Sequence, residues 1–170
     1  MLLRFAKSKH PADANPRRRS DTLTCIRDDG SITASKFRAS HDLVHYAVET
    51  ELDLPGSFYR LVAGGLDIEA FNQPGAAKRL NLPPGAGLTE IIVNLLEIER
   101  ASFTESDAEA FNSQLRAMCE QLGHAPLVVA AGSLARIRAR IDELFRAWSG
   151  VAPGGAMELR FPPIPAEVVP

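Results

Sequence analysis

The residues with the most distinctive chemistry lie in one short segment of the chain. His41 and His45 are two of only four histidines among 170 residues; they stand four positions apart, and Glu49 follows after another four. On a helix, at about 100° per residue, these three side chains fall within an arc of about 80° and share one side. Two imidazoles at this spacing can each place one nitrogen on the same Zn²⁺ ion. The segment therefore predicts a metal-binding pair on a helix.

The residue after the first histidine adds a catalytic interpretation. His-Asp-x-x-His is one methylene shorter than the His-Glu-x-x-His signature of zinc hydrolases, in which the acidic residue is the general base. In this interpretation Asp42 is the base, at shorter reach. A single zinc ion also needs a third protein ligand, which this segment supplies only if Glu49 turns toward the metal.

A second candidate for the third ligand is Glu99. Indexed along its predicted helix, Glu99 falls between Ile92 and Leu95 on the apolar face. A carboxylate buried there is costly unless it is paired or coordinated. We therefore expect Glu99 to meet His41 or His45 across a helix packing, either as a metal ligand or as a hydrogen-bond partner.

The same residues have a structural interpretation without a metal. Histidine pairs at this spacing arise on amphipathic helices, and a histidine at the edge of a core commonly donates to a carbonyl or a carboxylate. The motif carries Asp where the hydrolase signature has Glu, and no third ligand is assured by spacing alone. The sequence therefore favours the structural interpretation over metal binding.

Composition is that of an ordinary globular protein, with 45% hydrophobic and 24% charged residues. This length predicts one domain over residues 1–170. A formal net charge of −2 supplies no field to attract nucleic acid or an anionic membrane. We therefore expect neither partner, and we expect a small molecule or a protein instead, with homo-oligomerisation left open.

Two cysteines, Cys25 and Cys119, are too few for a disulfide framework and are expected to be reduced thiols in the core. The first residues lack the long apolar stretch of a signal peptide. Both observations predict a cytoplasmic protein.

Strand patterns lie at both ends of the chain. Alternation at Leu3 and Phe5, β-favouring runs at 22–27 and 32–37 joined by an Asp-Gly turn, and alternation at 157–161 predict four strands. Residues 8–20, which hold two prolines and three consecutive arginines, predict a mobile loop, and residues 162–170 an irregular tail.

Between the strands the apolar residues recur with helical spacing. Four main helices are expected, and shorter helical pieces lie at 57–63 and 67–71, followed by an irregular surface segment at 73–87. The main helices are predicted at 40–52, 89–101, 107–122 and 134–148. The result is an α+β fold, with a small, mainly antiparallel sheet of N-terminal strands plus a C-terminal strand, covered by these helices.

The segment His-Asp-Leu-Val-His-Tyr-Ala-Val-Glu at 41–49, the opening Leu-Leu-Arg-Phe and the closing Leu-Arg-Phe-Pro together carry a family resemblance. The chain resembles a group of bacterial proteins of similar length that are uncharacterised. The resemblance extends over most of the chain and implies no activity, cofactor or partner.

Two functional hypotheses follow. The first is a non-catalytic intracellular domain that binds a small molecule or a protein. The second is a metal-binding protein, with a zinc-dependent hydrolase as its catalytic form, built on the helix that carries His41 and His45. The sequence favours the first.

Overall fold

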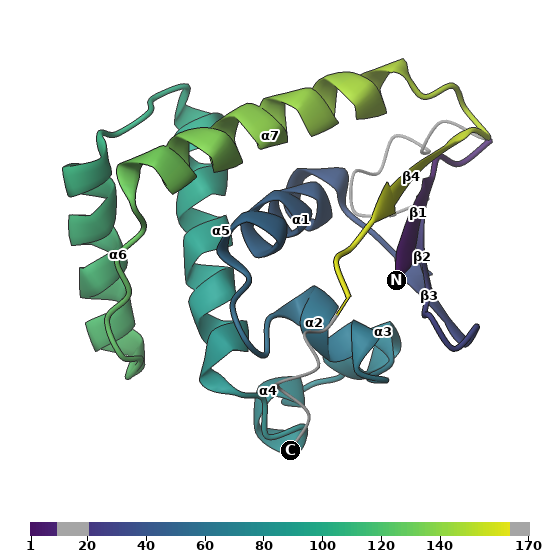
Figure 1. Ribbon diagram of the computed structural model, residues 1–170, viewed down its shortest axis with the longest axis horizontal. Coiled ribbons are helices and arrows are strands. Elements are labelled where there is room, and N and C mark those ends of the chain that lie inside the picture. The colour runs from purple at the N-terminus through teal and green to yellow at the C-terminus, as the bar shows by residue number, and fades with distance from the viewer. Residues whose placement is uncertain (10–20, 164–170) are drawn as a thin grey trace.

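The four predicted strands form one antiparallel sheet in a computed structural model that describes residues 1–9 and 21–163. They are β1 (Leu2–Ala6), β2 (Thr22–Ile26), β3 (Ile32–Lys36) and β4 (Ala156–Arg160), in the order β3-β2-β1-β4. The C-terminal strand pairs with the N-terminal one, with Leu3 opposite Leu159 (Figure 1). The prediction of an α+β fold that closes its sheet with the C-terminal strand is therefore confirmed.

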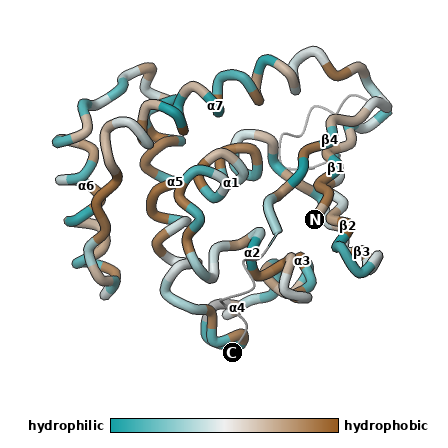
Figure 2. The backbone as a smooth tube through the Cα atoms, viewed as in Figure 1, coloured by the Kyte–Doolittle hydropathy of each residue, from teal (hydrophilic) through white to brown (hydrophobic). Residues whose placement is uncertain are grey.

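Alternation along the strands separates a buried face from a more exposed one. Leu3, Phe5, Leu23 and Cys25 are buried, while their neighbours along the strands are partly or fully exposed. The β2–β3 turn is hydrophilic (Figure 2) and uses Gly30 at a φ of +82°. Hydrophobic alternation therefore sets which face of the sheet meets the helices.

Seven helices occur in the described residues, and α1 lies at the centre of them. In Figure 1, α1 lies between the sheet and α5, α6 packs on α5 at the far side, and α7 runs from α6 back to the sheet. The helices are α1 (Ala39–Leu52), α2 (Phe58–Ala63), α3 (Ile68–Phe71), α4 (Ala76–Arg79), α5 (Pro84–Ser102), α6 (Ala108–Leu122) and α7 (Ala131–Gly150).

Long polar side chains join the helices to the sheet. Lys7 Nζ donates to the carbonyls of Trp148 and Val151 at 2.9 and 2.8 Å, where α7 ends. Tyr46 of α1 donates its hydroxyl to the carbonyl of Arg160 in β4 at 2.9 Å. These bonds satisfy backbone carbonyls beyond the helix and sheet ladders, and they hold α1 against the C-terminal strand.

The segment at 73–87 differs from the irregular surface that its Gly and Pro content predicts. It contains α4, and α5 begins at Pro84, five residues before the expected start. Proline is suited to the first helical position because its missing N–H has no partner there. A Cβ on Gly85 would lie only 1.8 Å from the carbonyl oxygen of Pro55, so the glycine permits close packing in a helix. With the earlier start, Glu90 lies in the second turn of α5 and not in the first.

Some expectations fall outside the described residues. Most of the predicted loop at 8–20, including its three arginines, lies in residues 10–20, and most of the predicted tail lies in residues 164–170. In the described part of the chain, no helix combines the length and apolarity needed to cross a membrane. The one-domain organisation stays a prediction.

The close approach at Gly85 leads to a stability prediction. Gly85→Ala should lower the free energy of unfolding by about 1–3 kcal/mol, because the added methyl overlaps the Pro55 carbonyl. Gly150→Ala, in a helical position with open space around it, should leave stability unchanged or raise it by up to about 1 kcal/mol. Urea unfolding of both variants measures the difference; equal effects would show that α5 does not pack on Pro55 in this way.

Candidate metal centre

The first helix presents the two histidines as its sequence spacing predicts. Asp42 Oδ2 accepts a hydrogen bond from the backbone N–H of Arg38 at 2.7 Å, which secures the start of α1. His41 and His45 then follow one turn apart on one side, with ring centroids 4.6 Å apart. His45 is only 2% exposed, while the side chain of His41 is about a quarter exposed, so the pair runs from the core toward the surface.

Helix α5 supplies two carboxylates to this pair. Glu90 and Glu97 are seven residues apart and therefore lie on the same side of α5, which packs against α1. Glu90 Oε1 lies 3.2 Å from His45 Nε2, and Glu90 Oε2 lies 3.8 Å from His41 Nε2. Glu97 Oε2 lies 3.2 Å from the other nitrogen of His41, Nδ1.

Glu49 is brought to the pair, but on the opposite side of His45 from Glu90. Its Oε1 lies 3.0 Å from His45 Nδ1, and its Oε2 accepts the backbone N–H of Tyr59 at 2.8 Å. The carboxylate is fully buried between α1 and the start of α2. Glu49 therefore orients the imidazole of His45 through Nδ1, whereas the sequence offered it as the third metal ligand.

Each imidazole has its Nδ1 against a carboxylate and its Nε2 in a common space. A carboxylate can only accept, so each ring can donate its Nδ1–H to the carboxylate beside it; in that tautomer a neutral ring has its lone pair on Nε2. The two Nε2 atoms are 3.2 Å apart. With Glu90, three acceptors converge on one point, so the arrangement requires a proton or a metal cation among them.

The charges around His45 favour its protonated form when no metal is bound. Burial lowers the pKa of His45, but hydrogen bonds and charge interactions with Glu49 and Glu90 outweigh burial and raise the pKa to about 10. Burial raises the pKa of Glu90, but the hydrogen bond to His45 and the positive charges of His45, His41 and Arg38 bring it below its ordinary value. A metal at this point must therefore displace a proton from His45.

A cavity of about 390 Å³ opens beside the histidines. Asp42, Glu90, Phe58 and Phe71 contribute to its wall, with Lys36 and Arg38 at the basic part of the lining. Asp42 lines this cavity together with both histidines. Its role as a base stays a prediction.

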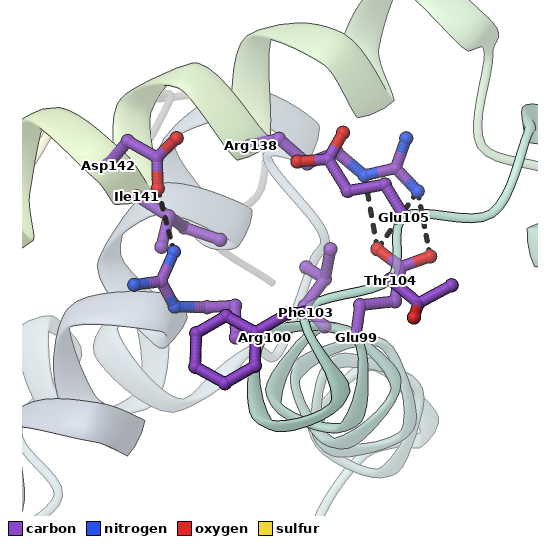
Figure 3. A pocket seen from close by; sticks show the side chains of 9 residues that line it. Glu99, Arg100, Phe103, Thr104, Glu105, Arg138, Ile141 and Asp142 are labelled. Carbon is purple, nitrogen blue, oxygen red and sulfur yellow. Dashed lines mark hydrogen bonds and ion pairs between the residues drawn. The ribbon is translucent and has the colours of Figure 1, made fainter.

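Glu99 is not brought to the histidines. Its side chain is about nine-tenths buried, as its place on the apolar face predicted, but it meets Arg138 of α7 in a double ion pair at 2.8 to 3.1 Å (Figure 3). Ser106 also donates its backbone N–H to Glu99 Oε1 at 3.1 Å. The buried charge of Glu99 is therefore paired, as expected, but with an arginine. The expected contact of Glu99 with His41 or His45 is wrong.

Glu90 and Glu97 are the site residues that the sequence did not single out. The predicted helix began at residue 89, which left Glu90 at its first turn with no assigned face. Around the axis of the observed helix α5, Glu90 and Glu97 lie about 20° apart, beside Val93 at the edge of the buried face. A seven-residue carboxylate spacing along an apolar stripe is the pattern that would have indicated them.

Comparison with known proteins adds no relative: no family model matches the chain, and no curated protein or solved structure matches it significantly. The resemblance to a bacterial family stays a prediction. The site is therefore interpreted from its own geometry.

The raised pKa of His45 predicts how stability depends on pH in the metal-free protein. The proton on His45 stabilises the fold fully below pH 6.5, its ordinary pKa, and this contribution is lost as pH rises toward about 10. The urea midpoint of chelator-treated protein should fall across this window, and His45→Gln should flatten the fall. His124→Gln, outside the cluster, should keep the wild-type slope; an unchanged slope in His45→Gln would contradict the assignment.

Proposed function

We propose that this protein binds a divalent metal ion through His41 Nε2, His45 Nε2 and Glu90, and that the preferred ion is Zn²⁺. The observation that carries the proposal is the convergence of these three acceptors. Zinc bonds of 2.0 to 2.1 Å in a tetrahedron separate neighbouring ligand atoms by about 3.3 Å. The two Nε2 atoms stand 3.2 Å apart, close to that requirement, and Glu90 reaches them with its two oxygens: Oε1 lies 3.2 Å from His45 Nε2 and Oε2 lies 3.8 Å from His41 Nε2.

The contacts behind the ligands support the same proposal. Metal-binding histidines usually donate their second N–H to a carboxylate, which sets the tautomer and the ring orientation. His45 has Glu49 in this place at 3.0 Å, and His41 has Glu97 at 3.2 Å. Glu49 is itself held by the Tyr59 amide, so the more buried ligand has the more rigid support.

The donor set favours zinc among common cations. Two imidazole nitrogens and one carboxylate form a ligand set of catalytic zinc sites, in which water or substrate takes the fourth position. Here the fourth position would face the 390 Å³ cavity, since both histidines and Glu90 line it. Calcium and magnesium prefer oxygen ligands and suit this set less well.

Hydrolysis is a second candidate function, favoured by the position of Asp42 in the same cavity. Asp42 would act on a metal-bound water as general base. Its Oδ2 also holds the start of α1, so Asp42→Asn, which keeps an acceptor oxygen, separates the two roles. If Asp42 is the base, zinc content should survive in Asp42→Asn while hydrolysis of an activated ester by the zinc-loaded protein is lost.

We also propose a cytoplasmic location and a small-molecule ligand. Cys25 and Cys119 are free and buried, in keeping with a reducing compartment. The cavity beside the histidines is within the size range of small-molecule sites. The alternative is a non-catalytic binding protein that holds no metal. The zinc titration described next distinguishes it from the metal proposal.

The metal proposal predicts one equivalent of zinc per chain. Calorimetric titration of untagged, chelator-stripped protein should give a stoichiometry of about one, with affinity that increases with pH because the metal displaces a proton from His45. His45→Ala should abolish binding, and Glu90→Gln should weaken it by one order of magnitude or more. Co²⁺ in place of Zn²⁺ should give the visible absorption bands of a tetrahedral site.

Matched controls identify the ligands. His124→Ala removes a histidine outside the cluster, and Glu109→Gln neutralises an exposed carboxylate on α6; both should bind zinc as the wild type does. Glu99→Gln should also retain binding, because Glu99 pairs with Arg138. Absence of zinc binding in the wild type, or equal loss in His45→Ala and His124→Ala, would contradict the proposal.

A further inference from the structure

A second cavity adjoins the cavity at the histidines and shares part of its wall. The second has a volume of about 500 Å³, against about 390 Å³ for the first. Phe58, Phe71, Leu82 and Glu90 line both of them. The two cavities therefore lie side by side along a wall that includes Glu90, a ligand of the proposed metal. We take them as two lobes of one groove and call them the metal lobe and the apolar lobe.

The apolar lobe is built mainly from rings and aliphatic side chains. Phe58 and Phe71 meet edge to face with centroids 4.9 Å apart, and both are only partly buried. Leu82, Pro83 and Ala86 continue the wall. Exposed rings in a concave surface lose water when an apolar group binds, so the lobe favours a hydrophobic body of small-molecule size.

His124 lies across the first turns of α5 at this lobe. A Cβ on Gly87 would lie 2.3 Å from His124 Cε1, so the absence of a side chain at Gly87 lets the imidazole lie on the helix. Within residues 1–9 and 21–163 no side chain or backbone group is hydrogen-bonded to this ring. His124 and Ala125 therefore form a wall of the apolar lobe without closing the metal lobe.

The metal lobe has the opposite character. Lys36 and Arg38 lie on its wall together with the carboxylates of Asp42 and Glu90. Arg38 is 3.6 Å from Glu97, whereas Lys36 is an exposed cation that forms no ion pair within the described residues. A bound divalent ion would add positive charge next to them. With that ion in place the positive charges outnumber the carboxylates of Asp42 and Glu90, so an anionic group would complement this lobe, and an oxygen ligand suits the fourth position of zinc.

We propose that the groove binds a small amphipathic carboxylic acid. Its carboxylate takes the open metal position between His41, His45 and Glu90, and its aliphatic or aromatic body extends past Glu90 into the apolar lobe. This assignment rests on the proposed metal site. It follows from two lobes of opposite character that share the side chain of one metal ligand.

The test uses the intact, zinc-loaded protein and a series of acids: acetate, butyrate, hexanoate, octanoate and 3-phenylpropionate. Each added methylene that leaves water should tighten binding by about fourfold, until the lobe is filled. Calorimetry measures the affinities. With Co²⁺ in the site, each acid should also shift the visible absorption bands, because its carboxylate enters the coordination sphere.

Ala125→Trp tests the apolar lobe separately from the metal. Ala125 is exposed at the wall of that lobe, so a large side chain there should occupy the part of the lobe beside His124, away from His41 and His45, which do not line it. The variant should bind one zinc and acetate as the wild type does, but lose the dependence on chain length. Ala117→Trp, at an exposed position on α6, is the matched control and should keep that dependence.

The outcomes separate the two proposals. If zinc binds but all acids bind equally, or if Ala125→Trp keeps the chain-length dependence, the amphipathic ligand is wrong and the metal site stands. If the acids bind the metal-free protein with the same affinities, the carboxylate does not coordinate the metal and the assignment is overturned. If zinc itself does not bind, both proposals fail.

Discussion

A buried carboxylate in the middle of the molecule sets the geometry around it. Glu49 is fully buried, and such a group is tolerated only when its oxygens are hydrogen-bonded. One oxygen takes the imidazole of His45 from its own helix, and the other takes the amide of Tyr59 at the start of α2. The same contacts that satisfy Glu49 therefore hold α2 against α1. They also turn Nε2 of His45 toward Glu90 of α5.

A second carboxylate solves the same physical problem in another way. Glu99 points into the contact between α5 and α7, where the guanidinium of Arg138 meets both of its oxygens. This pair is a charge-neutral structural contact that joins the two longest helices. The negative charge of Glu99 is balanced by a permanent cation, whereas the acceptor atoms of His41, His45 and Glu90 can be balanced only by a proton or a metal ion.

That difference connects structure to the proposed function. In the metal-free protein, Glu49 and Glu90 raise the pKa of His45 and so stabilise its protonated form. With a metal bound, Glu49 would orient the imidazole and Glu90 would be a ligand beside it. The centre also lies at the wall of a groove whose other part is apolar. A site that exchanges a proton for a metal beside a hydrophobic lobe is suited to an amphipathic ligand with one anionic end.

Short-range geometry was determined by the sequence alone. The pairing of the histidines on one side of a helix, the buried face of the strands and the inward position of Glu99 all follow from the rotation per residue within one element. The contact of His45 with Glu49 belongs to the same class, because four positions on a helix are one turn. These features need no knowledge of how the elements meet.

The tertiary structure alone decided which carboxylates meet the histidines. Glu90 and Glu97 reach them because α5 packs against α1, with its first turn on Pro55, where Gly85 allows contact with the carbonyl. Glu99, on the same helix, is turned toward Arg138 of α7 instead. Periodicity gives the direction of a side chain around the axis of its own helix. Which residue it meets in that direction depends on how the helices cross, and the crossing is set by packing over the entire core.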